Sequence, residues 1–280
     1  MMLRACGVSI TNASASAVDL GTQFGFVLES PEQFLAQMQR QFPVAEIGGR
    51  AGQTFLSALG RESARDLGLS GHIVADDLSQ LQTRVDGFKR WLTNGDLQVV
   101  SNFDTSRYYL GRLAHAPMVV VGKAFRTSGG LAQRVTVSIL CADPHAWAVT
   151  ATTLAIASNT ACDPGTAIAR PVITVTGVHT NLLLTLKNAG GTTQETMGFT
   201  LTIAGAADTV VIDCDRMTVR KTVSGVTTNA IDTITSGAFP TFLALDPNDG
   251  DQLMATVPSL SASFGSGTPT VSANWRKRYR

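Results

Sequence analysis

Residues 67–94, LGLSGHIVADDLSQLQTRVDGFKRWLTN, contain a strand pattern followed directly by a helical one. Up to Ile73, apolar residues alternate with small or polar ones, which is typical of a half-buried strand. From Asp76 onward, apolar residues recur at steps of three and four, which predicts a helix over residues 76–94 with one apolar stripe. We expect six side chains of this helix to pack against a sheet: Leu78, Leu81, Val85, Phe88, Trp91 and Leu92.

The strand pattern continues beyond the helix through the first half of the chain. In the run Gln133–Cys141, the alternate residues Val135, Val137 and Ile139 are apolar, which predicts a further strand with one buried face. Residues 1–150 are therefore expected to form a β-sandwich-like domain, with the helix 76–94 lying across one face of its sheet.

The second half of the chain has no long helical pattern. Residues 151–168 are rich in Ala, Thr and Asn, and they predict a connector that could include one strand. In residues 169–280, β-patterned runs alternate with turn formers such as Asn248-Asp249-Gly250. About eight strands at this spacing predict a β-sandwich or jelly roll, so the expected fold class is mainly β.

Charged side chains are scarce in this sequence. Asp, Glu, Lys and Arg make up 15% of the chain, against about 25% in a typical soluble domain. Charge is depleted in the cores of protein interfaces, so the composition favours a chain whose surface is partly covered by partners. A low-charge β-protein that stays monomeric is the alternative reading of the same composition.

Charge, hydropathy and cysteine usage exclude several classes of protein. The net charge of +1 gives no general attraction to nucleic acid or to an anionic membrane. No apolar run approaches the roughly 20 residues that a membrane helix needs, and residues 1–7 do not look like a signal peptide. The four cysteines, Cys6, Cys141, Cys162 and Cys214, lack paired spacing, so we expect no disulfide framework and synthesis in a cytoplasm.

Motifs that would carry chemistry are missing from the sequence. It contains no Cys-x-x-Cys, no pair of histidines at metal-ligand spacing, no phosphate loop ending in Gly-Lys-Ser/Thr and no Gly-x-Ser-x-Gly elbow. A glycosidase would need two carboxylates held across a cleft, and Asp213/Asp215 and Asp249/Asp251 are the available pairs. Turns explain both pairs better, so we expect no catalytic, cofactor or metal site and no enzyme activity.

The end of the chain is its densest basic stretch and a candidate interface: Trp275, Arg276, Lys277, Arg278, Tyr279 and Arg280. Aromatic residues between arginines can stack nucleic-acid bases, but a subunit contact or an ion-paired strand end suits a neutral chain better. A carbohydrate-binding module that contacts a host surface is an alternative function. Trp275 and Tyr279 are the only Trp and Tyr after residue 150, so a stacking face for sugars is poorly supplied.

Several segments, taken in order, resemble the distal tail proteins of long-tailed bacteriophages. The run from Leu67 through the helix to Tyr108-Tyr109-Leu110-Gly111-Arg112 resembles their N-terminal domain, which Val137–His145 would close. The stretch Gly165–Gly177 is similar to the entry into their second, galectin-like sandwich. Val211-Ile212-Asp213, Phe239-Pro240 and the turn Pro247-Asn248-Asp249-Gly250 fit the remainder.

This resemblance implies a structural virion protein at the tip of a phage tail. Proteins of that family form a hexameric ring through their N-terminal domains, which meet the tail tube protein above and the tail hub below. The C-terminal sandwiches point outward and can carry receptor-binding parts. The family therefore implies a homo-hexamer, the tube and hub proteins as partners, no nucleic-acid contact outside the ring lumen, and no membrane insertion.

Overall fold

The protein is described by a computed structural model over residues 8–12, 18–29, 40–41, 44–46, 53–55, 61–62, 64–93, 95–101, 104–127, 130–236, 242–247 and 257–279. The fold class is mainly β, as the sequence predicts. The chain divides into two compact units, Met1–Trp147 and Ala148–Arg280.

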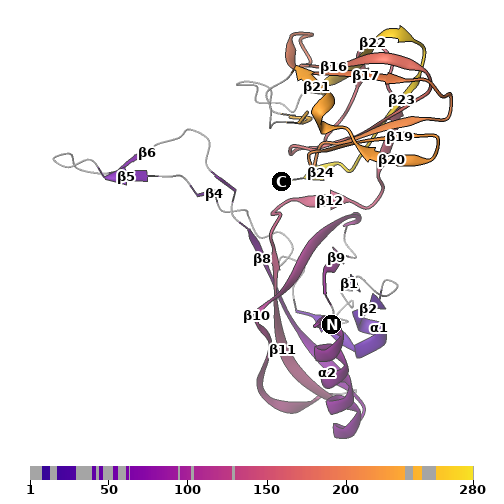
Figure 1. Ribbon diagram of the computed structural model, residues 1–280. Coiled ribbons are helices and arrows are strands. Elements are labelled where there is room, and N and C mark those ends of the chain that lie inside the picture. Colours follow the sequence, from indigo (N-terminus) through magenta and orange to yellow (C-terminus); the bar gives the residue numbers. More distant parts are fainter. Residues whose placement is uncertain are drawn as a thin grey trace. The chain divides into compact units, whose positions relative to one another are not determined.

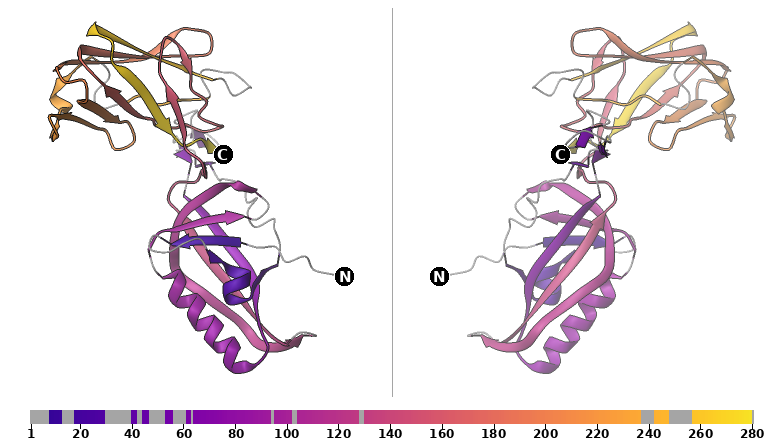
Figure 2. Two further views of the ribbon diagram at one scale, coloured as in Figure 1. Left: turned by 90° about the vertical axis from the view of Figure 1, so that its right-hand side faces the viewer. Right: turned by 90° about the vertical axis from the view of Figure 1, so that its left-hand side faces the viewer.

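The first unit contains a long antiparallel sheet with one principal helix along its face (Figures 1 and 2). Its strand order is β2 (Val18–Asp19), β1 (Val8–Asn12), β9 (Leu97–Ser101), β10 (Asp104–Thr127), β11 (Gly130–Cys141), β8 (Arg65–Ala75) and β3 (Phe26–Leu28). Two further short pairs are β4 (Arg40–Gln41) with β7 (Arg61–Glu62), and β5 (Val44–Glu46) with β6 (Gln53–Phe55). The strand β12 (Ala146–Ala148) lies at the boundary between the units.

The helix α2 (Leu78–Leu92) lies within the predicted range 76–94. Asp77 is its N-cap, and the Asp77 carboxylate accepts a 2.8 Å hydrogen bond from the Gln80 N–H, which satisfies a donor that the first turn leaves free. The apolar stripe faces β8 and β11: Leu81, Val85, Phe88 and Leu92 are buried, and Trp91 is half-buried against the same core.

Leu78 departs from the expected packing, because its side chain is 56% exposed. It is the first residue of α2, directly after the turn that leaves β8. Helical side chains point back toward the N-terminus of their helix, so the side chain of a first residue has no turn beneath it to cover. The apolar stripe on the sheet therefore begins at Leu81.

A second, short helix, α1 (Leu20–Phe24), was not expected from the sequence. Asp19 caps it by accepting a hydrogen bond from the Thr22 N–H at 2.9 Å, and Gly25 ends it at φ 65°. Five residues are too few for a period to be recognised, so the cap at Asp19 and the glycine stop were its only sequence signals.

Aromatic rings join the helices to the sheet in the core of the first unit. The ring of Phe88 on α2 lies 5.4 Å from that of Phe24 and 5.5 Å from that of Phe26, measured between centroids. Gly71 on β8 makes room for this cluster, because a Cβ there would lie 2.5 Å from Phe26 Cζ. No larger residue fits at this position without moving the ring or the backbone of β3.

The strand β10 runs through Pro117 without a break. Its first part pairs with β9 and its second part with β11, with register shifts between Leu113 and Met118 and between Val121 and Phe125. Proline is tolerated in a strand at such irregularities, since the missing N–H breaks no regular ladder bond. One strand therefore links both parts of the sheet.

The second unit is a sandwich of two antiparallel sheets. One has the order β13 (Thr152–Ala155), β23 (Thr270–Trp275), β15 (Val172–Thr176), β18 (Thr209–Asp213), β19 (Thr218–Val223) and β20 (Val226–Asn229). The other has the order β14 (Thr160–Ala161), β22 (Ser259–Gly267), β16 (His179–Lys187), β17 (Thr193–Ile203) and β21 (Ile234–Ser236). A 3-10 turn, η2 (Ile231–Thr233), lies between β20 and β21 in the sequence, and the short strand β24 (Arg278–Tyr279) follows β23.

The core of this sandwich is formed by alternate residues of both sheets. Ile173 and Ile212 from the first sheet and Leu184 and Phe199 from the second are each 0–2% exposed and belong to one cluster. This arrangement needs no helix to cover an apolar face, because each sheet covers the other.

Residues 151–168 differ from the expected connector, because they contribute strands to the second unit. β13 pairs with β23 along Thr152–Ala155, and β14 pairs with β22. Cys162, in the same segment, is fully buried in the core of the sandwich. A Thr- and Ala-rich composition also suits an edge strand, which is bonded on one side only.

Candidate assembly surface

The strands β8 and β11 carry an apolar face and a polar face. Leu67, Leu69 and Ile73 on β8 and Val135 and Val137 on β11 are fully buried beneath α2. The residues between them point to the other side of the sheet, where they are exposed or half-buried. We call this second side the outer face, and its polar members are Asp66, Ser70, His72, Arg134, Thr136 and Ser138.

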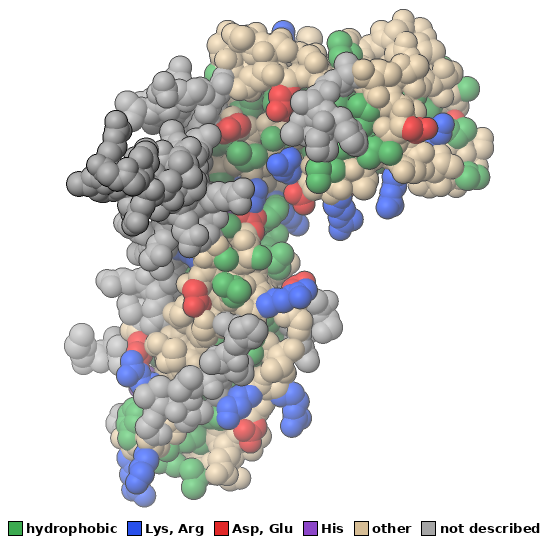
Figure 3. Space-filling model, turned by 60° about the vertical axis from the view of Figure 1, so that its left-hand side comes forward, with side chains coloured by type: hydrophobic (Ala, Val, Ile, Leu, Met, Phe, Trp, Pro, Cys, Tyr) green, Lys and Arg blue, Asp and Glu red, His purple; other side chains and the backbone are tan. Residues whose placement is uncertain are grey.

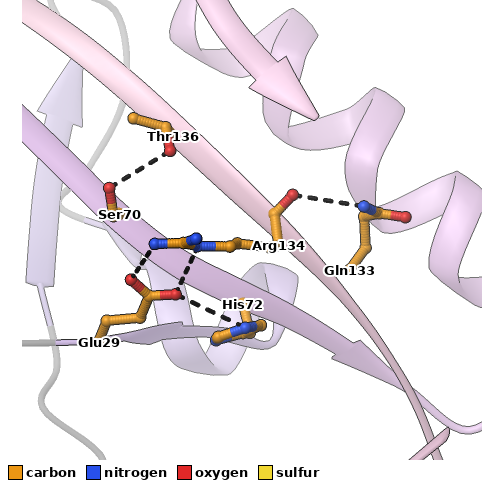
Figure 4. Close-up of polar contacts among 6 residues, drawn as sticks. All are labelled: Glu29, Ser70, His72, Gln133, Arg134 and Thr136. Carbon is orange, nitrogen blue, oxygen red and sulfur yellow. Dashed lines mark hydrogen bonds and ion pairs between the residues drawn. The ribbon is translucent and has the colours of Figure 1, made fainter. Parts of the chain in front are cut away.

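An ion pair joins the end of β3 to β11 on the outer face (Figure 4). Arg134 Nε lies 2.8 Å from Glu29 Oε1, and Arg134 Nη2 donates to Glu29 Oε2 at 2.9 Å. His72 Nε2 lies 3.6 Å from the same carboxylate. The two-pronged geometry holds the carboxylate in one orientation, since the guanidinium fork matches its two oxygens.

The main chain supports this ion pair. The Glu29 N–H donates to the Ser70 carbonyl at 3.0 Å, so Glu29 is fixed through its backbone as well as its side chain. The side chains of Glu29 and Arg134 are 27% and 47% exposed. Pairs this accessible contribute little to stability, so the main effect of these contacts is to fix the position of Glu29 at the end of β3.

Hydroxyl groups link β8 and β11 along the rest of the outer face. Ser70 and Thr136 are direct cross-strand neighbours, and their hydroxyl oxygens lie 3.3 Å apart (Figure 4). Further along, the Ser138 hydroxyl donates to Asp66 Oδ1 at 2.6 Å. These polar side chains are therefore partly satisfied within the sheet and present a preformed surface.

Apolar side chains border the polar ones. Phe125 on β10 is 45% exposed, and its ring meets that of His72 edge-on at 5.5 Å. Leu140 on β11 and Leu110 on β10 are 47% and 39% exposed. Exposed apolar groups beside preformed polar ones are the usual composition of a protein–protein contact. On the face of each unit seen in Figure 3, charged side chains are scattered among uncharged atoms.

The thiols of the described residues are inert groups of the core. Burial raises the pKa of Cys141 to about 12, that of Cys162 to about 11 and that of Cys214 to about 12. A thiol acts as a nucleophile or metal ligand only when it is deprotonated, and these three are neutral at physiological pH. No group of three His, Cys, Asp or Glu side chains at metal-binding distance occurs among the residues that the structure describes.

The acidic pair of Asp213 and Asp215 forms a turn. Asp213 Oδ1 accepts hydrogen bonds from the N–H groups of Asp215 and Arg216 at 3.1 and 2.9 Å. This is the local bonding by which aspartate initiates turns. The other pair, Asp249 and Asp251, lies outside the described residues.

The C-terminal basic stretch is tied into its own unit. Trp275 is 3% exposed, and its indole N–H donates to the Asp163 carbonyl at 2.8 Å. Lys277 forms an ion pair with Asp163, and Arg278 Nη1 donates to the Ile168 carbonyl at 2.8 Å. Arg276 Nη1 donates to the Ala148 carbonyl at 3.0 Å, Tyr279 is half-buried, and Arg280 lies outside the described residues.

This packing shows that Trp275 is not available as a stacking residue for sugars. A sugar cannot stack on Trp275, because the indole is covered by its own chain. The polar ends of Arg276, Lys277 and Arg278 bond to residues 148–168 of the same unit. The stretch therefore holds the last strand against that segment.

The outer face is a feature that the sequence did not reveal. Strand alternation indicated which residues of β8 and β11 point away from the helix, but Glu29 and Arg134 are 105 positions apart. No sequence signal connects them, because their meeting depends on β3 pairing with β8 and β8 pairing with β11.

The two units together define a class of fold: a helix-covered β-sheet unit followed by a β-sandwich. Among solved structures, this chain is similar to one described as "Crystal Structure of SPP1 Dit (gp 19.1) Protein, a Paradigm of Hub Adsorption Apparatus in Gram-positive Infecting Phages". The TM-score is 0.64 at 15% identity, over 98% of this chain and 99% of that one. The likeness establishes a shared fold over nearly the full length of both chains.

A second similar chain comes from the phage P2 baseplate in its activated conformation with Ca, with a TM-score of 0.46 at 9% identity and 99% coverage of both chains. That likeness is too distant to support an argument. No family model matches the sequence, and no characterised protein matches it at a significant level.

Proposed function

We propose that this chain is a structural virion protein that forms a hexameric ring at the distal end of a phage tail. In this role it joins the tail tube to the tail hub and the host-recognition apparatus, and it is not an enzyme. The observation that carries the proposal is the fold shared with SPP1 Dit, which extends over 98% of this chain and 99% of that one. The chain is made in the cytoplasm of the host bacterium and resides at the tail tip.

Two properties of the chain support this role. Its charged content of 15% is low for a surface that faces water on all sides. The outer face offers hydrogen-bonding groups held by neighbours, together with the exposed side chains of Phe125 and Leu140. In a closed ring every subunit makes the same contacts, so a preformed face is covered on each copy.

The proposal is tested by imaging the purified full chain by negative-stain electron microscopy and weighing it by mass photometry. We expect six-fold rings with a central hole, either alone or after mixing with the tube and hub proteins of the same phage. Monomers alone under both conditions would contradict the proposal.

A matched pair of variants examines the outer face. Leu140→Arg places a charge on the outer face, and Leu78→Arg places one at the start of α2; both leucines are largely exposed in the single chain. We expect Leu140→Arg to reduce the fraction of rings and Leu78→Arg to leave it unchanged. An equal fraction of rings in the two variants would show that the outer face takes no part in the contact between subunits.

A further inference from the structure

The second unit has a hollow of about 350 Å³ on the exposed side of the sheet that contains β16 and β17. It crosses four neighbouring strands, β22, β16, β17 and β21, which lie side by side in Figure 1. Leu183 stands at its centre, opposite Ser263 on one side and Gly198 on the other. Gly198 and Gly265 line the hollow without side chains of their own, and the amide of Asn181 lies close to Gly265.

Four neutral polar side chains line this hollow: Asn181, Thr200, Thr235 and Ser263. Within the described part of the chain, none of the four has a hydrogen-bond partner. One neighbouring couple on the same face is paired, because the hydroxyls of Thr180 and Ser266 lie 2.8 Å apart. The hollow itself offers a few polar groups to a ligand, which is how a binding site presents its polar contacts.

The backbone supports the placement of one of these groups. Asn181 has φ 48°, a left-handed conformation, at a register shift of β16 between Thr180 and Leu182. Asparagine adopts this conformation more readily than most residues. The shift directs the Asn181 amide into the hollow, where a regular strand would continue its alternation.

The lining determines the chemical class of the ligand. Among the described residues that line the hollow, none is charged, so a phosphate or carboxylate would find no Arg or Lys. Hydroxyl and amide groups can each donate and accept hydrogen bonds, as sugar hydroxyls do. Leu183, which is 40% exposed, offers an apolar contact to the C–H face of a ring.

We propose that this hollow binds one or two residues of a neutral saccharide. Thr200, Ser263 and Asn181 bond to sugar hydroxyls, and Leu183 packs beneath the ring. The site is separate from Trp275, which is buried. It is also independent of the proposed ring, because all of its lining residues belong to the second unit.

The test is saturation-transfer NMR on the full chain with lactose, maltose, a rhamnose disaccharide and an N-acetylglucosamine disaccharide. Glycerol 3-phosphate serves as the charged comparison. We expect one of the neutral sugars to bind with a dissociation constant on the order of 1 mM, since so small a ligand has few atoms to contribute. The method works on a monomer or a hexamer, so its result does not depend on ring formation.

Matched variants identify the site. Thr200→Val removes one hydroxyl from the hollow with little change in shape, and Thr202→Val makes the same change two residues along the same exposed face, outside the hollow. We expect Thr200→Val to weaken binding by about two- to tenfold, as for one lost hydrogen bond, and Thr202→Val to leave it unchanged.

Three results would overturn the proposal: no neutral sugar in the panel binds, both variants act alike, or glycerol 3-phosphate binds as well as the sugars. Thermal unfolding followed by circular dichroism, with equal midpoints for the two variants, establishes that the comparison concerns binding.

Discussion

The two units cover their sheets in different ways. In the first, α2 packs on the apolar side of β8 and β11 through Phe88, while the other side carries the linked pair Glu29 and Arg134. In the second, each sheet covers the other, and the exposed face around Leu183 is neutral. The core of the first unit joins two helices to one sheet, whereas the core of the second is formed between two facing sheets.

Among the variants that test this comparison, Phe88→Ala is expected to change the stability of one unit the most. Phe88 is 1% exposed and contacts both Phe24 and Phe26, so its truncation should lower the free energy of unfolding of the first unit by about 3–5 kcal/mol. Hydrogen exchange measured by mass spectrometry should show faster exchange in β8 and β11 and unchanged exchange in β16 and β17.

The control is Leu78→Ala on the same helix, where the exposed side chain should cost less than about 1 kcal/mol. If Phe88→Ala accelerates exchange equally in both units, the units unfold together and their cores are not independent.

Gly71→Ala should come next in size. A Cβ at this position would lie 2.5 Å from Phe26 Cζ and from the Val27 carbonyl oxygen, so we expect a loss of about 1–3 kcal/mol from overpacking. Gly68→Ala on the same strand meets nothing within 4 Å and should be neutral or slightly stabilising. Urea denaturation of the two variants gives the comparison, and equal midpoints would show that β3 can shift away from β8.

A smaller effect should appear at high pH through the buried thiols. Burial raises the pKa of the Cys214 thiol from 9.0 to about 12. The stability from this source is complete below pH 9, and it is lost as the pH rises toward 12, because the unfolded thiol ionises while the native one cannot.

The urea concentration at the denaturation midpoint should therefore decrease as the pH is raised from 8 to 10.5. The decrease should be less steep in Cys214→Ala. The slope with pH is the measured quantity, since the variant also leaves a small cavity. Identical slopes in the two proteins would mean that Cys214 does not contribute to alkaline unfolding.

The smallest effect is expected from Asp163, which holds the C-terminal stretch. Burial acts to raise the pKa of Asp163, but hydrogen bonds from Lys277 and from the Gly165 N–H outweigh it, and the pKa lies below its ordinary value. The resulting stability is present above the ordinary pKa and is lost as the pH falls through the lowered one.

Asp163→Asn should therefore reduce the loss of stability on acidification of the second unit, while Asp215→Asn, in an exposed turn, should leave it unchanged. The measurement is the thermal midpoint between pH 6 and pH 3. A parallel pH dependence in wild type and Asp163→Asn would show that the pair with Lys277 is too solvent-exposed to matter.

Local patterns in the sequence determined much of the fold. The spacing of Leu81, Val85, Phe88 and Leu92 predicted α2 and the face that it buries, and the alternation in β8 and β11 predicted their apolar side. These signals survive in the sequence because each side chain faces the core at a period set by its own element. The same reasoning failed at Leu78, where the stripe continues beyond the sheet that it covers.

Only the tertiary structure determined which side chains meet on the surfaces of the two units. The meeting of Glu29 with Arg134 depends on the pairing of β3, β8 and β11, and the hollow around Leu183 depends on four strands from different parts of the chain. The burial of Trp275 follows from the return of residues 151–168 to the sandwich. Periodicity records which side of an element is buried, but the partners across a surface are set by strand order, which no local pattern encodes.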